Sequence, residues 1–303
     1  YFTKQETLDY FKDVENTLKN VRKKEGFTEE TIRLEIEFLH MKGRYLIRDG
    51  DYDTGTNLIQ DMILKSKEIH YSDYTLEGYK QMIFYYIQTY KKDLMIKYIE
   101  LGIDLALELN YHKEVGILLR LKGLYKIMCC EYEEAEKLLN ESINTFNITK
   151  QVANKYSLNI AAAYNYIGEI RRYKMKFDEA LSYYEKAIEI CKSKNSLISL
   201  AVFSINAGQA AFDMKDYEKA REYFEKADDL YQRFDSIWRR SIQEAFMCLI
   251  NCNSQNYQEA FKCLKNAVNH SNQMKNPHEI GIVYRVKAEI KVMMSKNKNM
   301  EKI

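Results

Sequence analysis

The chain has 303 residues, of which 46 are basic and 44 acidic, so its formal net charge at pH 7 is +2. Aliphatic and aromatic residues make up 46% of the chain and charged residues 30%, which is typical of a soluble globular protein. Because the two signs of charge are mixed throughout, the chain lacks the basic stripe that direct nucleic-acid binding requires, and its apolar runs are too short to span a membrane.

The hydrophobic pattern predicts helices from one end of the chain to the other. The first is an amphipathic helix over residues 6–24, and we expect residues 1–27 to form an N-terminal capping helix or the end of an upstream repeat. Residues 28–303 are expected to form one array of helical hairpins without an internal domain boundary. In chain order the hairpins cover residues 28–70, 72–110, 112–149, 151–193, 195–234, 236–273 and an incomplete 277–303.

The hairpins share a fixed spacing of three residue types. A small residue, usually Gly, stands nine residues before an aromatic residue and twelve before an Ala or a second Gly. Since Gly inside a helix costs roughly 1 kcal/mol relative to Ala, we expect each Gly to allow the close approach of a neighbouring helix. The spacing occurs as Gly43, Tyr52 and Gly55; Gly123, Tyr132 and Ala135; Gly168, Phe177 and Ala180; Gly208, Tyr217 and Ala220; and Cys248, Tyr257 and Ala260.

The clearest copies of this pattern, at residues 166–187 and 206–227, resemble the tetratricopeptide repeat (TPR) family. The aromatic positions Phe177 and Tyr217 are 40 residues apart, against roughly 34 in the family, and the first half of the array is degenerate. The resemblance implies an all-α fold, a right-handed superhelical solenoid of about seven antiparallel helix hairpins with a truncated C-terminal repeat. The long repeat is similar to the TPR regions of Gram-positive bacterial regulators, which include intracellular peptide-pheromone receptors.

No motif in the sequence predicts catalysis. Gly-rich phosphate loops and the His-Glu-x-x-His and Gly-x-Ser-x-Gly motifs are absent, and the five His are scattered over separate repeats. Cys248 and Cys252 lie one helical turn apart, with Cys263 and His270 downstream, which is a weak indication of a metal site. Because Cys248 occupies the small-residue position of its repeat, we interpret these thiols as core residues. The sequence therefore predicts no catalytic residue, no metal and no cofactor.

In the TPR family the first helix of each hairpin lines a concave groove, and the ligand contacts flank the small residue. Transferred to this sequence, these positions predict a lining of apolar side chains with Arg, Asn, Gln and Glu interspersed, a mixture that suits a bound peptide. The residue pairs that would clamp a C-terminal carboxylate are not matched, for example at Asn165 and Glu169. The predicted partner-binding residues are Arg44, Arg48, Tyr86, Arg120, Asn165, Glu169, Arg172, Tyr173, Gln209 and Asp213.

These observations lead to one leading hypothesis and one alternative. The chain is expected to be the non-catalytic, protein- or peptide-binding TPR region of a larger cytoplasmic bacterial regulator that continues past residue 303. Neither nucleic acid nor a membrane is expected as a direct partner. The alternative is a structural array that dimerises or spaces other domains without a dedicated ligand, and a homodimer is compatible with both. If the groove is correct, alanine at Asn165 and Arg172 should weaken partner binding without lowering the melting temperature.

Overall fold

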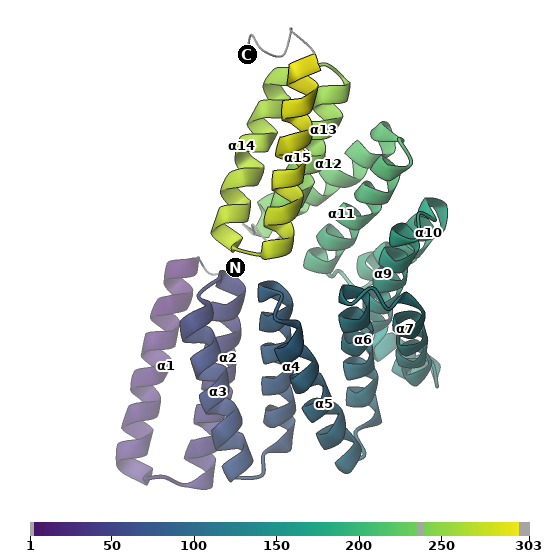
Figure 1. Ribbon diagram of the computed structural model, residues 1–303. Helices are drawn as coiled ribbons and strands as arrows, with labels where there is room; N and C mark the ends of the chain where they lie inside the picture. Colours follow the sequence, from purple (N-terminus) through teal and green to yellow (C-terminus); the bar gives the residue numbers. More distant parts are fainter. Residues whose placement is uncertain (1–2, 235–238, 297–303) are drawn as a thin grey trace. The chain divides into compact units, whose positions relative to one another are not determined.

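The computed structural model describes residues 3–234 and 239–296, and within these ranges it contains 15 α-helices and no β-strand (Figure 1). None of the described helices is long and apolar enough to cross a membrane. The second helix expected for the last hairpin would fall in residues 297–303, which lie outside the described residues. The expected start of the sixth hairpin, at residues 236–238, also lies outside them.

A first compact unit comprises residues 1–111. Helices 2 and 3 of this unit pair as a hairpin, helices 4 and 5 form a second hairpin, and the first helix packs beside the second. The first helix begins with a capping box, in which Thr3 and Glu6 satisfy each other's free backbone N–H groups. The helices of this unit are α1 (Lys4–Glu25), α2 (Glu29–Asp49), α3 (Tyr52–Glu68), α4 (Ser72–Thr89) and α5 (Lys92–Glu108).

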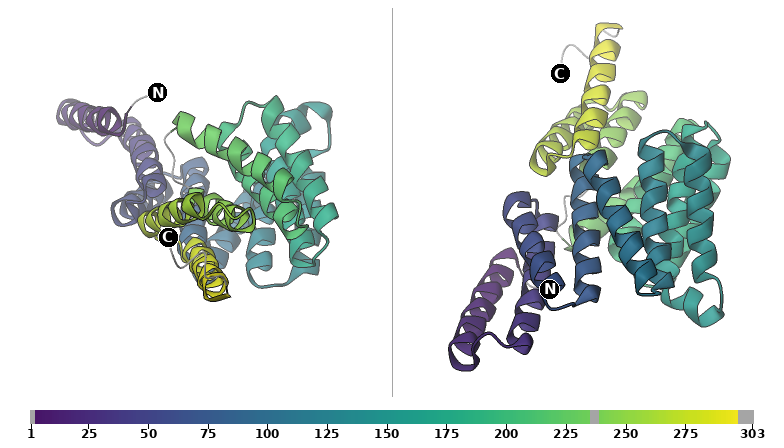
Figure 2. Two further views of the ribbon diagram at one scale, coloured as in Figure 1. Left: turned by 90° about the horizontal axis from the view of Figure 1, so that it is seen from above. Right: turned by 60° about the horizontal axis from the view of Figure 1, so that its bottom comes forward.

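A second compact unit comprises residues 112–303. Its described helices are α6 (His112–Met128), α7 (Tyr132–Phe146), α8 (Lys150–Lys155), α9 (Ser157–Tyr173), α10 (Phe177–Ser193), α11 (Leu197–Asp213), α12 (Tyr217–Phe234), α13 (Arg240–Asn253), α14 (Tyr257–Met274) and α15 (Pro277–Lys296). Helices α6 and α7, α9 and α10, α11 and α12, and α13 and α14 pair as hairpins, and α15 packs on α13 and α14. The views of Figure 2 show these hairpins beside one another in chain order.

The division of the chain at residue 111 differs from the uninterrupted array that the sequence predicts. Helices α1–α5 pack mainly among themselves, and so do α6–α15. The connection between the two units is a short turn without Gly or Pro enrichment, so composition carries no signal of the division. The short helix α8 was also not expected as a separate element, since the pattern places the start of one longer helix there.

The recurring aromatic residue begins the second helix of the hairpin, as Phe177 does in α10 and Tyr217 in α12. The first helix ends just before it with a residue in the left-handed backbone conformation, such as Met175 with a φ of 58°. The backbone N–H of Lys176 then donates to the carbonyl oxygen of Arg171 at 2.9 Å. This Schellman arrangement satisfies the last carbonyl groups of the helix and reverses the chain within a few residues.

The recurring Gly makes room for a side chain from the second helix, which is an aromatic ring at Gly168 and Gly208 and an aliphatic side chain at Gly43 and Gly123. A Cβ atom at Gly168 would lie 2.7 Å from Cε1 of Tyr184, and one at Gly208 would lie 2.7 Å from Cε1 of Phe224. Both rings are fully buried. Burying a ring of this size contributes about 1.5–3 kcal/mol, which offsets the cost of Gly in a helix. The expected close approach is therefore confirmed, and the group that approaches is a side chain of the second helix.

Candidate functional site

The first helices of successive hairpins in the second unit carry a connected set of polar side chains. Helices α9, α11, α13 and α15 contact one another in this order. On α9 and α11 the polar residues recur at spacings of three or four, which places them on one face of each helix. We call this network the inner polar cluster; its members are Asn165, Glu169, Arg172, Tyr173, Tyr184, Asn206, Gln209, Asp213, Arg239 and Glu279.

The centre of the inner polar cluster is a group of amides. Nδ2 of Asn206 donates to Oδ1 of Asn165 at 2.8 Å. Oδ1 of Asn206 in turn accepts from Nη2 of Arg239 at 3.1 Å and from Nε2 of Gln209 at 3.4 Å. Asn206 is 1% exposed and Asn165 3% exposed. Hydrogen bonds between buried polar groups compensate for the water that these groups lose, so the amides hold α9, α11 and the start of α13 in register.

Charged groups form the accessible part of the cluster. Nε of Arg172 lies 2.8 Å from Oδ2 of Asp213, and both side chains are half-buried. Burial by itself would lower the pKa of Arg172, but Glu169 and Asp213 raise it above its ordinary value. Arg172 therefore stays positively charged at every physiological pH. Beside it Tyr173 is 44% exposed and stacks on Tyr132, with ring centroids 5.9 Å apart.

Tyr184 approaches the cluster from the second helix α10. Its side chain is fully buried, and its hydroxyl group has no hydrogen-bond partner among the described residues. Burial and the negative charge of Glu169 raise the pKa of Tyr184 well above its usual value, while Arg172 and Arg239 oppose the increase. An unpaired buried hydroxyl costs about 1–3 kcal/mol, so it marks a point where the network can accept one more hydrogen bond.

The cluster contains six of the side chains that the sequence predicts for partner binding: Asn165, Glu169, Arg172, Tyr173, Gln209 and Asp213. Asn165 and Gln209 are buried, so they form the floor of the site rather than its surface. The half-buried Glu169, Arg172 and Asp213 and the exposed Tyr173 form its rim. The structure thus divides these six residues into a buried floor, which holds the helices together, and a rim, which remains accessible.

The predicted arginines outside the cluster lie in three different surroundings. On α6, Nη2 of Arg120 donates to Oδ1 of Asn159 at 3.4 Å, near the beginning of α9. Arg44 and Arg48 are exposed on α2, in the first compact unit. The guanidinium group of Arg48 lies 5.9 Å from the ring centroid of Phe84 on α4. None of these residues has a hydrogen bond or ion pair with the inner polar cluster among the described residues.

The structure corrects the prediction for Tyr86. Its side chain is 6% exposed, and its ring centroid lies 5.6 Å from that of Tyr98 on α5. Burial is the main reason why the pKa of Tyr86 is raised to about 12, with Tyr98 and Tyr85 adding to the increase. Tyr86 is therefore a core residue of the first unit, because α4 turns this position toward α5.

The sequence-based prediction misses Asn206, Arg239 and Tyr184. The family pattern places a ligand contact three residues before the small residue, which is Ile205 in the repeat of Gly208. The side chain of Ile205 is fully buried, and the residue that hydrogen-bonds to Asn165 is the next one, Asn206. Asn206 does carry a signal, since a polar residue between the apolar Ile205 and Ala207 of α11 needs a partner when it is buried. The sequence gives no such signal for Arg239, which precedes α13, or for Tyr184, which lies on the second helix of its hairpin.

Glu279 brings a buried acid into the cluster. Its side chain is 2% exposed, and its Oε2 lies 2.6 Å from Oγ of Ser241. Burial raises the pKa of Glu279 above its ordinary value, and the hydrogen bond from Ser241 and the charge of Arg239 counteract only part of this increase. A carboxyl group with a raised pKa in the folded state destabilises the fold once it is ionised.

We therefore expect a pH-dependent effect of Glu279→Gln. At pH 7 the variant should melt at a higher temperature than the wild type, because it carries no buried charge. Below the ordinary pKa of Glu, where the carboxyl is protonated in both folded and unfolded states, the difference should disappear. Thermal unfolding at pH 4, 5.5 and 7 measures this difference. A difference that is the same at all three pH values would contradict the assignment.

The thiols of α13 and α14 belong to the hydrophobic core. Cys248 and Cys252 are buried and unpaired, and Sγ of Cys263 lies 3.8 Å from Nδ2 of Asn251. His270 directs Nδ1 at Oε2 of Glu244 at 2.7 Å. Within residues 3–234 and 239–296, no group of three His, Cys, Asp or Glu side chains is placed to hold a metal ion. The thiols therefore pack as small apolar side chains.

Comparison with protein-family models matches residues 114–193 and 159–233 to the tetratricopeptide repeat. These segments run from α6 into α12 and contain the α9 and α11 members of the inner polar cluster. A search of curated protein sequences finds no significant match to the chain.

Solved structures with a similar fold include two that hold a bound peptide or factor. NprR in complex with its cognate peptide NprX has a TM-score of 0.64 at 18% identity, covering 94% of this chain and 83% of that one. A Rap protein complexed with Competence and Sporulation Factor has a TM-score of 0.60 at 14% identity, covering 98% and 89%. Aspartyl phosphate phosphatase F from Bacillus subtilis has a TM-score of 0.59 at 16% identity, covering 90% and 74%. At these identities the likeness concerns the fold, and it confirms the predicted all-α, TPR-like solenoid.

Proposed function

We propose that the inner polar cluster binds an extended peptide segment, either a free peptide or part of a protein partner, since residues 114–233 match the tetratricopeptide repeat. In this proposal the chain is the non-catalytic binding region of a larger cytoplasmic bacterial regulator. The partner is a peptide or protein rather than a nucleic acid or a membrane. A peptide that contacts the rim residues of α9 and α11 together changes the relative positions of α9, α11 and α13, and an attached domain can respond to this change.

One observation carries this proposal. The ion pair of Arg172 and Asp213, whose side chains are 16% and 28% exposed, stands on a floor of hydrogen-bonded amides with the exposed ring of Tyr173 beside it. A peptide backbone offers alternating N–H donors and carbonyl acceptors, and a paired Arg and Asp can engage both. Tyr adds a rigid apolar contact, which explains why it is frequent at binding interfaces. The buried floor keeps the rim side chains in place before the ligand arrives, which lowers the entropic cost of binding.

The structural relatives support the class of ligand. NprR and the Rap protein are each seen in complex with a peptide or factor, and both share the solenoid fold over most of this chain. A third relative is a phosphatase by name. The proposal follows the peptide-bound structures, because the described residues offer no nucleophile paired with a base inside the cluster.

The experiment uses peptides selected from a random display library with the full chain as bait. Their affinity is then measured by calorimetry for the wild type and for the double variant Arg172→Gln, Asp213→Asn, which removes both charges without leaving one buried and unpaired. We expect the double variant to bind at least tenfold more weakly, a loss of about 1.4 kcal/mol.

A matched control lies next to the tested pair. Arg171 forms an ion pair of the same type with Glu136 on α7, at 2.6 Å. The double variant Arg171→Gln, Glu136→Gln should therefore bind the selected peptides within about twofold of the wild type. If both double variants lose affinity equally, or if neither does, the binding site is not at the inner polar cluster.

The alternative is a structural array that dimerises. Tyr284 and Val292 on α15 are 50% and 54% exposed, so the last described helix presents apolar surface that a second copy could cover. A mass that rises from monomer to dimer with concentration in light scattering, combined with a display selection that yields no peptide, would favour this alternative.

A further inference from the structure

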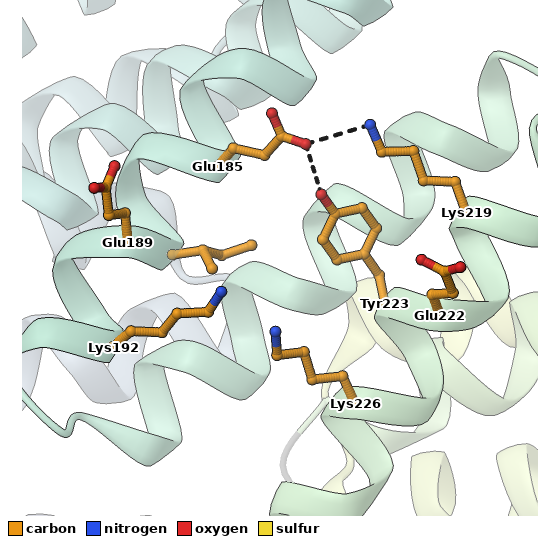
Figure 3. A pocket seen from close by; sticks show the side chains of 8 residues that line it. Glu185, Glu189, Lys192, Lys219, Glu222, Tyr223 and Lys226 are labelled. Carbon is orange, nitrogen blue, oxygen red and sulfur yellow. Dashed lines mark hydrogen bonds and ion pairs between the residues drawn. The ribbon is translucent and has the colours of Figure 1, made fainter.

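A cleft with an unusual distribution of charge lies between the second helices α10 and α12 of the second unit (Figure 3). It has a volume of about 350 Å³ and does not include any member of the inner polar cluster. The buried side chain of Ile188 lies among its lining residues. The eight lining residues include three Glu and three Lys, and the two ends of the cleft differ in how these charges are paired. At one end, here called the neutral end, a carboxylate and a lysine form an ion pair, whereas the two lysines at the other end have no ion pair among the described residues.

At the neutral end, the carboxylate of Glu185 is fully engaged. Its Oε1 lies 3.3 Å from Nζ of Lys219 and accepts a hydrogen bond from the hydroxyl of Tyr223 at 2.7 Å. Figure 3 shows these three side chains meeting across the gap between α10 and α12. A ligand gains little at this end, since binding there would have to displace an existing ion pair.

At the other end, two lysines face each other without a carboxylate between them. Figure 3 shows that Lys192 extends from α10 and Lys226 from α12, and that their ammonium groups point toward one another. Glu189 and Glu222 also line the cleft, but neither forms an ion pair with these lysines among the described residues. The pKa of Lys226 is lowered by burial and, next, by the proximity of Lys192.

Two ammonium groups at one position repel each other, and an anion with oxygen atoms on several sides relieves this repulsion most effectively. A carboxylate carries one negative charge, whereas a phosphate group carries about 1.5 to 2 at neutral pH and offers more acceptor oxygens. We propose that Lys192 and Lys226 together bind a phosphate group in the cleft between α10 and α12. The cleft is larger than a phosphate ion, so the group can be free or carried by a larger molecule. This site is independent of the proposed peptide binding, because none of its lining residues belongs to the inner polar cluster.

The test follows the lysine side chains themselves. In protein labelled with ¹³C at Lys Cε, inorganic phosphate is added at constant ionic strength, with chloride as the balancing anion. We expect a saturable shift of the Lys192 and Lys226 signals and a rise in the pKa of Lys226, because the bound anion stabilises the ammonium form. The Lys226 signal in Lys192→Gln, and the Lys192 signal in Lys226→Gln, should respond to phosphate with at least tenfold lower affinity.

A control variant and two further anions, phosphoserine and acetate, test whether the response is specific for phosphate at this site. Lys186→Gln removes an exposed lysine of α10 that does not line the cleft, and it should leave the phosphate response unchanged. Phosphoserine that binds tenfold more tightly than inorganic phosphate assigns the site to a phosphorylated partner, while equal affinities assign it to free phosphate. The proposal is overturned if acetate binds as tightly as phosphate, or if the one lysine that remains in Lys192→Gln and in Lys226→Gln responds to phosphate with the affinity of the wild type.

Discussion

Replacing Gly168 with Leu is expected to lower the free energy of unfolding of the second unit by about 3 kcal/mol. A Cβ atom at this position would lie 2.7 Å from Cε1 and 2.8 Å from Cδ1 of Tyr184, closer than such contacts occur. The ring cannot withdraw, because it is fully buried between the two helices of its hairpin. The hairpin must therefore open or Tyr184 must leave its rotamer, and each response loses packing in the core. Thermal unfolding should show a melting temperature lower by roughly 6–12 °C.

Gly281 provides the matched control for this substitution. It also lies within a helix, α15, but a Cβ atom there would have no neighbouring atom within 4 Å. Leu at Gly281 should therefore leave the protein unchanged or stabilise it by up to about 1 kcal/mol, through its better helix propensity alone. If Gly168→Leu melts at the temperature of the wild type, Gly168 does not mark a close approach between helices.

Replacing Asn206 with Ala is expected to destabilise the second unit by about 3 kcal/mol, since it removes the centre of the amide network. Three groups lose a partner at once: Oδ1 of Asn165, Nη2 of Arg239 and Nε2 of Gln209. Asn165 and Gln209 are buried, so water cannot replace the missing hydrogen bonds without opening the helices. Urea unfolding followed by circular dichroism measures this loss.

The control for this prediction is an asparagine on the surface. Asn272 is exposed on α14, and Asn272→Ala should change the free energy of unfolding by no more than about 0.5 kcal/mol. Equal stabilities of the Asn206→Ala and Asn272→Ala variants would mean that the amide network does not hold the inner helices together.

The burial of Asn165 changes an expectation drawn from the sequence. Alanine at Asn165 was expected to affect binding alone, on the assumption that its side chain faces solvent. The side chain is 3% exposed and accepts a hydrogen bond from Asn206, so the substitution lowers stability as well. The rim pair of Arg172 and Asp213 is therefore the better probe of partner binding.

Local pattern was sufficient to locate the hairpins. The spacing from Gly168 to Phe177 predicted where one helix ends and the next begins, and α10 does begin at Phe177. The same register brought Arg172 and Asp213 onto neighbouring helices, where they form an ion pair. It failed at Tyr86, where the pattern is degenerate and the side chain is buried against Tyr98. The offset from the small residue is reliable only where the repeat itself is well preserved.

The sequence by itself determined that this protein is an all-α stack of helical hairpins. It could do so because helix periodicity, turn positions and the Gly that admits a side chain of the second helix are local properties that recur along the chain. Tertiary packing alone decided that the chain divides at residue 111, that Asn206 rather than Ile205 pairs with Asn165, and that Lys192 meets Lys226. These features involve residues on different helices. They depend on how the helices rotate and tilt against one another, and this cannot be read from any single stretch of sequence.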